Sequence, residues 1–224
     1  MAGERLSGAI TALDVQARDQ SRVNLYLDGR FAFGISAKTA ADAGLKKGDH
    51  LTPDRIVGLL KVEAHEQAMM QAFNYLSYRG RSVKEMERYL RRKAHAPETI
   101  SSVVQRMVDL HYLDDDHFAA LWVENRQRFG GRGPHLVRSE LLQKGVARET
   151  ADAVIAGAGG DETAQALDAA RKKAVSLRTA DYGEFTRKLG GYLSRRGFSS
   201  DVVWDAVKRL WRERNSESNA DEDE

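Results

Sequence analysis

The sequence LLQKGV at residues 141–146 decides the fold, because the chain contains it three times in related form. Residues 90–95 read LRRKAH and residues 193–198 read LSRRGF, at offsets of 51 and 52 from the middle copy. Each copy has a leucine, a basic residue three positions later and then a small residue. Repetition at this period is typical of a chain built from repeated structural units.

Apolar residues keep helical spacing on both sides of each copy. Ten residues after the leucine stand Ile100, Ala151 and Val203, which we expect to face the core from a following helix. A further amphipathic helix is expected before each copy. The sequence thus predicts a mainly α protein of three tandem three-helix repeats, which would stack into an elongated, curved array.

Local signals predict where these helices begin and end. Ser82 and Glu85 form a capping box, in which the serine hydroxyl and the glutamate carboxylate each accept a backbone N–H at a helix start. Gly145 and Gly197 follow their helices where a left-handed cap is expected, whereas Ala94 takes this place in the first copy. Three prolines suit the first position of a helix, and they are Pro53, Pro97 and Pro134.

The N-terminal region has a different pattern. Apolar and polar residues alternate at 23–27, and Asp28-Gly29 then separates this stretch from 30–33. Asp-Gly suits the positive φ angles of a two-residue hairpin turn. With 9–15 as a third strand, the sequence predicts a small antiparallel β-sheet before the helical repeats.

These patterns divide the chain into five parts. We expect an N-terminal β-hairpin or sheet with a linker helix, three repeats and a disordered acidic tail. Their predicted bounds are 1–60 for the sheet region, 61–112, 113–158 and 159–214 for the repeats, and 215–224 for the tail.

Composition excludes several classes of protein. The chain has no cysteine, which removes disulfides and thiolate chemistry and suits a reducing compartment. Its longest uninterrupted apolar run, 118–123, is far shorter than the ~20 residues that span a bilayer. We therefore expect a soluble, cytoplasmic protein without a membrane partner.

Catalytic and metal-binding patterns are also missing. No two of the six histidines have the spacing that places two ligands on one helical face, and no nucleophile has an evident base. Asp114, Asp115 and Asp116 could hold a cation, but capping of the following helix explains them better. We expect no enzyme activity, no metal and no cofactor.

Charge is unevenly distributed along the chain. Of 35 basic and 33 acidic residues, five acids and no base lie at 215–224, so residues 1–214 carry an excess of seven positive charges. Such a body suggests a polyanionic or acidic partner. The acidic tail is interpreted as a solvated segment.

Basic residues gather within each repeat, at positions where stacking would align them into a stripe complementary to phosphates or to an acidic protein. The candidate binding residues are Arg79, Arg81, Arg88, Arg91 and Arg92 in the first repeat, Arg126, Arg128, Arg132 and Lys144 in the second, and Arg195 and Arg196 in the third. Among the aromatic residues, Tyr89, Trp122 and Trp204 are expected in the core.

Several motifs together resemble the bacterial RecX family of regulatory proteins. They are RVNLYLDG at 22–29, FAFG at 31–34, YLSYRGRS at 75–82, YLDD at 112–115, ELLQKG at 140–145 and YLSRRGF at 192–198. Ala94, where a glycine is usual, and Gly80, where a proline is frequent, depart from the pattern without touching the charged positions.

The resemblance implies a non-enzymatic negative regulator of homologous recombination and of the SOS response. Such a protein binds the groove of the RecA filament on single-stranded DNA, blocks filament extension and suppresses ATP hydrolysis, strand exchange and coprotease activity. We expect a monomer that also binds single- or double-stranded DNA weakly and without sequence specificity. The alternative is an autonomous helical nucleic-acid-binding protein, similar to a transcription regulator, which would select a specific duplex sequence.

Overall fold

The computed structural model describes residues 6–129, 131–177 and 181–220. The described residues form two compact units, one within 1–79 and 86–110 and the other within 80–85 and 111–224. Helix α3, Val83–Arg92, therefore begins in the second unit and continues in the first.

The first unit begins with a four-stranded antiparallel sheet in the order β3-β2-β1-β4. Its elements are β1 Gly8–Gln16, β2 Asp19–Leu27, β3 Arg30–Ser36 and β4 His50–Leu51, with helix α1 Ala37–Asp42 before β4. One face buries Ile10, Leu25 and Ile35 against Ile56 of helix α2, Pro53–Leu76. The expected three-stranded sheet is confirmed, and β4 is a short addition to it.

The predicted hairpin turn explains how the three long strands pair. Asp28 and Gly29 have φ angles of 47° and 80°, as a turn with two left-handed residues requires. The Asp28 carboxylate also accepts a hydrogen bond from the Ala9 N–H at 3.0 Å. The turn residue thus holds the start of β1 as well as joining β2 to β3.

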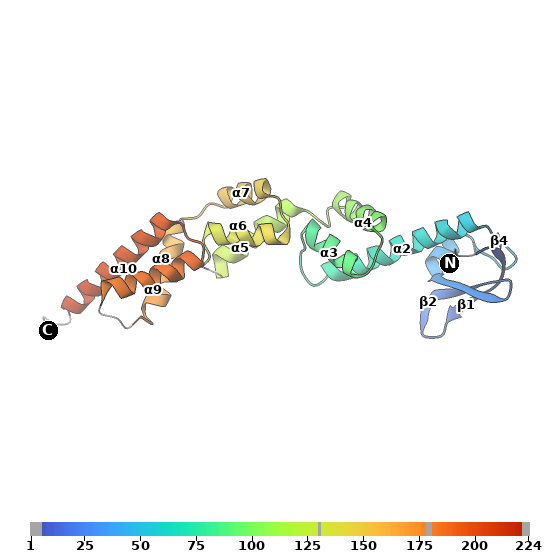
Figure 1. The fold of residues 1–224 in the computed structure, drawn as a ribbon, viewed down its shortest axis with the longest axis horizontal. Coiled ribbons are helices and arrows are strands. Elements are labelled where there is room, and N and C mark those ends of the chain that lie inside the picture. The colour runs from blue at the N-terminus through green and yellow to red at the C-terminus, as the bar shows by residue number, and fades with distance from the viewer. Residues whose placement is uncertain (1–5, 130, 178–180, 221–224) are drawn as a thin grey trace, which may run out of the picture. The chain divides into compact units, whose positions relative to one another are not determined.

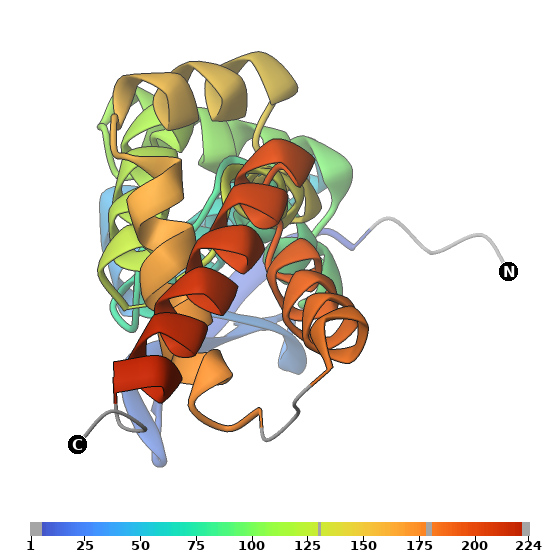
Figure 2. The same ribbon diagram turned by 90° about the vertical axis from the view of Figure 1, so that its left-hand side faces the viewer.

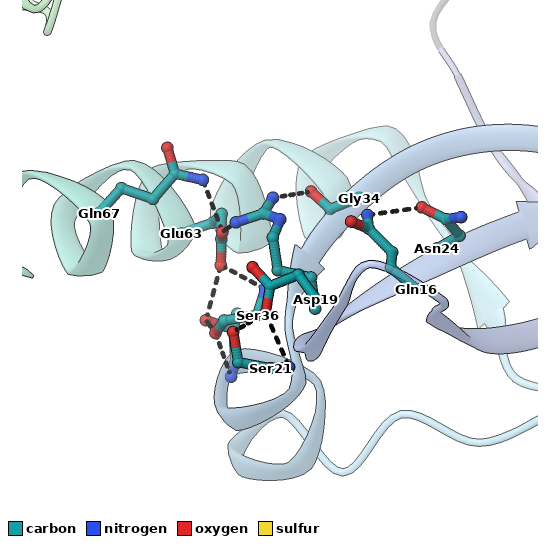
Figure 3. A network of polar contacts seen from close by, with 10 residues as sticks. Gln16, Asp19, Ser21, Asn24, Gly34, Ser36, Glu63 and Gln67 are labelled. Carbon is teal, nitrogen blue, oxygen red and sulfur yellow. Dashed lines mark hydrogen bonds and ion pairs between the residues drawn. The ribbon is translucent and has the colours of Figure 1, made fainter.

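A buried carboxylate joins the sheet to α2 (Figure 3). Glu63 of α2 is only 4% exposed and accepts hydrogen bonds from Arg22 Nη1 at 2.9 Å, the Ser36 N–H at 2.8 Å and Gln67 Nε2 at 2.7 Å. Thr39 Oγ1 donates a fourth at 3.1 Å. Burial alone would raise the pKa of Glu63, but these donors stabilise the carboxylate and the net effect lowers that pKa.

The first repeat consists of the second half of α2 with α3 and α4, Pro97–Asp109. Ala68 and Ala72 of α2, Leu90 of α3 and Ile100 of α4 are buried. The Tyr75 and Tyr89 rings stack at a centroid distance of 4.0 Å. Figure 1 shows α2 continuing from the sheet to this repeat, so one helix serves both parts of the unit.

The second unit contains the other two repeats, each with its own core. Helices α5 Asp115–Phe129, α6 Pro134–Lys144 and α7 Arg148–Gly157 form the second repeat, around residues such as Phe118 and Leu141. Helices α8 Glu162–Ala174, α9 Tyr182–Arg195 and α10 Ser200–Ala220 form the third, around Phe185 and Leu193. Figure 2 shows α10 (red) beside α8 and α9, in agreement with their packing.

The second helix of every repeat ends in the same left-handed cap. Ala94, Gly145 and Gly197 have φ angles of 62°, 90° and 81°. The next N–H donates to the carbonyl of the motif leucine, at 3.3 Å for Leu90, 3.1 Å for Leu141 and 3.4 Å for Leu193. The repeated motif in the sequence therefore encodes this cap. Its leucine supplies the accepting carbonyl, and its small residue adopts the left-handed backbone conformation.

The two glycine caps also form the junctions between repeats. Gly133 N–H donates to the Arg196 carbonyl at 2.8 Å, and His135 N–H donates to the Gly197 carbonyl at 3.1 Å. At the corresponding place one repeat earlier, Ser82 Oγ donates to the Lys144 carbonyl at 2.6 Å. In both junctions, unpaired carbonyls at one helix end meet donors at the start of another helix.

Close approach explains why these two caps are glycine. A Cβ on Gly145 would lie 2.3 Å from Lys84 Cβ, and a Cβ on Gly197 would lie 2.2 Å from the Leu136 nitrogen. Ala94 is exposed and ends the second helix of the first repeat. Because only the left-handed backbone constrains this position, alanine is tolerated there at a moderate cost.

Other local predictions are confirmed, and two need correction. Pro53, Pro97 and Pro134 each begin a helix, and Ser82 Oγ accepts from the Glu85 N–H at 3.1 Å. Trp204 was expected in the core but is 53% exposed, and it borders an open groove between α9 and α10.

The acidic tail was expected to be disordered from residue 215. Helix α10 instead continues to Ala220, because no proline or glycine interrupts 200–220 and extending an existing helix costs little. The last four residues, 221–224, lie outside the described part of the chain.

Candidate docking surface on the basic helices

The basic candidates fall into two groups: those whose side chains make ion pairs, hydrogen bonds or ring contacts around the second repeat, and those that are more exposed to solvent. Four of them lie around the second repeat and its junction with the third. These are Arg126 on α5, Arg132 before α6, Lys144 at the end of α6 and Arg196 at the end of α9. All four are only partly exposed.

Glu140 organises most of this group. Its carboxylate, 15% exposed, accepts from Trp122 Nε1 at 2.8 Å and from Arg126 Nε at 2.7 Å, and it also pairs with Arg132. Arg126 and Lys144 both lie against the Trp122 ring, each 4.2 Å from its centroid. Two cations thus lie over the indole, and the glutamate that pairs with Arg126 also accepts from the indole N–H.

Lys144 also makes an ion pair at the start of α3. Its ammonium pairs with Glu85 at 3.2 Å, and the exposed fractions of the two side chains are 19% and 13%. Glu85 is also the capping-box residue at that helix start. Lys144 therefore contributes to the junction, and its backbone carbonyl does so as well.

Positive charge is dense around the junction of the second and third repeats. Arg196 donates to the Gly131 carbonyl at 3.1 Å and lies 4.7 Å from the Tyr192 ring centroid. Burial, together with the charges of Arg126 and Arg196, lowers the pKa of Arg132. Three guanidinium groups therefore share this region, and Glu140 pairs with two of them.

The remaining candidates are more exposed. Arg88, Arg91 and Arg92 lie on the solvent side of α3, opposite the buried Met86 and Leu90. Arg195 is exposed on the last turn of α9, and Arg128 pairs with Glu124 at 3.7 Å on the surface. Arg79 is exposed and Arg81 half-buried in the segment before α3.

Three of these arginines stand out. Within the described ranges, the side chains of Arg91, Arg92 and Arg195 make no hydrogen bond or ion pair. Arg91 and Arg92 also lie in the last turn of α3, where the helix dipole favours a cation. These three can therefore bind a partner without losing a hydrogen bond or an ion pair within the described structure.

The acidic run before α5 serves the fold. Asp114 Oδ1 accepts from the His117 N–H at 2.9 Å, which confirms the predicted N-cap. Asp115 accepts from the Val83 N–H at 2.9 Å, while its burial raises its pKa. In the described part of the chain, no three histidine or acidic side chains are grouped as a metal site would need, and no helix is long and apolar enough to cross a membrane.

Glu140 is the important residue that charge counting missed. Its motif, ELLQKG at 140–145, drew attention only to the lysine. The sequence does contain a signal, because Glu140 is an acidic residue in the same predicted repeat as Trp122, Arg126 and Arg132.

Models of a known protein family match most of the chain. Four family models match the chain: the RecX N-terminal domain at residues 8–52, and the first, second and third three-helix domains of RecX at 68–107, 114–155 and 161–207. The matched segments correspond to the sheet and to the three repeats described above.

Related proteins and structures agree with these matches. The chain is 30% identical to the regulatory protein RecX of Bacillus subtilis over 93% of this chain and 80% of that protein. It is 39% identical to that of Lactobacillus johnsonii over 62% of this chain and 51% of the relative. A crystal structure of regulatory protein RecX shares the fold with a TM-score of 0.71, at 24% identity over 91% of this chain and all of that one. A RecX structure from Lactobacillus salivarius covers 66% of this chain and 97% of its own, at a TM-score of 0.61 and 24% identity. The chain belongs to the RecX family of regulatory proteins.

Proposed function

We propose that this chain regulates RecA by binding the filament that RecA forms on single-stranded DNA and by blocking its extension. The observation that carries the proposal is the set of exposed arginines without an internal partner on helical repeats of the RecX family. Blocked extension would lower ATP hydrolysis, strand exchange and coprotease activity, and so restrain recombination and the SOS response.

The two classes of basic residue have different roles in this proposal. Arg91, Arg92 and Arg195 supply docking charge, with Arg79, Arg81, Arg88 and Arg128 as further candidates. Arg126, Arg132, Lys144 and Arg196 first hold the repeats together, and they contribute a positive field rather than direct contacts.

Co-sedimentation of the chain with RecA filaments on single-stranded DNA tests the proposal. We expect the chain to pellet with filaments and less so as salt is raised, because screening weakens charge-driven docking. An absence of binding at low salt contradicts the proposal. Selection of one sequence from a random duplex pool would instead support an autonomous nucleic-acid-binding regulator.

Charge reversal separates docking from folding. The double change Arg91→Glu and Arg92→Glu should weaken filament binding by at least roughly tenfold, because like charges facing each other cost several kcal/mol. It should lower the free energy of unfolding by only about 1–2 kcal/mol, through the dipole of α3, since neither side chain has a hydrogen-bond or ion-pair partner among the described residues.

Lys46→Glu with Lys47→Glu provides the matched control. Both lysines are exposed in the N-terminal region, and the change in net charge is the same. If the control weakens binding as much as the arginine pair does, the effect is one of net charge and not of a docking surface on α3.

A further inference from the structure

The third repeat carries an open groove between α9 and α10 that the basic residues above do not use. Its volume is about 260 Å³, and its lining includes Gly190 and Gly191 of α9 and Trp204 of α10. Ser194 and Ser200 line it as well. Trp204 is 53% exposed, so a large flat ring borders this open space.

The second repeat shows how the same place is closed. At the offset of 52 residues, Gly190 corresponds to Arg138 and Trp204 corresponds to Asp152. Arg138 and Asp152 form an ion pair across α6 and α7. The third repeat thus replaces a closing pair of charges with a glycine and an exposed tryptophan, which leaves the groove open.

The chemistry of the lining suits a nucleobase attached to a phosphate. Among the described residues, no carboxylate lines the groove, whereas the exposed Arg187 does. Thr186, which also lines it, has a buried hydroxyl without a hydrogen-bond partner in the described structure. A flat aromatic face for the base and a cation for the phosphate are the groups that bind single-stranded nucleic acid.

We infer that this groove, the Trp204 groove, binds an unpaired base of single-stranded DNA, stacked on Trp204 with its phosphate near Arg187. The inference rests on the proposed function in that a RecA filament supplies such DNA. It goes further by assigning the third repeat a direct contact with a base. Because every base has a π face, this contact requires no particular sequence.

Intrinsic fluorescence of the full chain, titrated with oligothymidylate without RecA, provides the test. Arg126 and Lys144 contact the Trp122 ring, and the ring centroids of Trp211 and Phe185 are 5.2 Å apart. Trp204 is the most exposed of the three tryptophans and therefore the one most accessible to a stacking base. We expect oligothymidylate to quench the emission, and Trp204→Ala to remove the quenching and weaken binding about five- to 150-fold.

Gly190→Leu gives a second variant that keeps the tryptophan. A Cβ on Gly190 would lie 3.8 Å from Val203 Cγ1, an ordinary contact, and leucine is the better helix former. This variant should fill the groove and lose both quenching and affinity without a fall in stability. Val175→Ala, at an exposed site of α8's C-cap, is the control and should change neither.

The inference is overturned if Trp204→Ala binds oligothymidylate as tightly as the parent chain. It is also overturned if emission responds only to duplex DNA or to RecA protein, because the groove would then take another partner. In each case co-sedimentation with filaments is measured separately, so the proposed function can stand when the Trp204 groove fails.

Discussion

Replacing Gly197 with alanine is expected to lower the free energy of unfolding of the second unit by about 2–5 kcal/mol. The φ angle of 81° disfavours any residue with a Cβ. That Cβ would also lie 2.2 Å from the nitrogen and 2.8 Å from the Cα of Leu136, which are backbone atoms. They cannot withdraw without breaking the bond from His135 N–H to the Gly197 carbonyl, so the change opens the junction.

Urea denaturation followed by tryptophan fluorescence measures this loss, because all three tryptophans lie in the second unit. Gly159→Ala is the matched control. Its φ angle of 60° is also left-handed, but nothing lies within 4 Å of an added Cβ, so only the backbone cost of about 1–2 kcal/mol remains. Equal losses in the two variants would contradict a tight junction at Gly197.

Glu63→Gln is expected to destabilise the first unit by about 3–5 kcal/mol, as is usual when one partner of a buried ion pair is removed. The amide cannot accept the four hydrogen bonds that the carboxylate now receives, and Arg22 loses its charge partner. Hydrogen exchange of the β2 and β3 amides would report the loss, since Arg22 and Ser36 belong to those strands.

Glu66→Gln, one turn further along α2, is the control. Glu66 is half-buried and its side chain pairs with Lys38 at 3.4 Å, an arrangement worth at most about 1 kcal/mol. If the two variants lose the same protection, Glu63 does not join the sheet to α2.

Glu63 also predicts a pH dependence. The pKa of its carboxyl in the folded chain is lowered from the ordinary value of 4.5, so the stabilisation is complete above that value. It is lost as the pH falls from 4.5 through the folded pKa, because protonation removes the negative charge and turns one acceptor oxygen into a donor. Glu63→Gln should lack this part of the acid sensitivity, and an unchanged acid profile would contradict the assignment.

Much of the fold is predictable because its signals are local. Asp28-Gly29 predicts the hairpin, Ser82 and Glu85 predict a helix start, and the repeated leucine and glycine predict the cap. Each depends on backbone geometry within a few residues, so a single sequence contains the whole cause.

The candidate site is less predictable because its causes are not local. Lys144 appears as one more cation until Glu85, 59 positions earlier, is found beside it. Trp204 stands next to the buried Val203 in the helical pattern, but it borders the open groove between α9 and α10 and is 53% exposed. Charge and hydrophobicity along the chain therefore predict which residues are candidates, but the partner of each side chain decides its role.

The rate of ATP hydrolysis by RecA on single-stranded DNA, titrated with this chain, decides whether the chain regulates RecA by docking on the filament. We expect the rate to fall at substoichiometric amounts or at a modest excess of the chain, and Arg91→Glu with Arg92→Glu to shift the curve to higher concentration. A rate that stays constant across the titration would contradict regulation of RecA by filament docking.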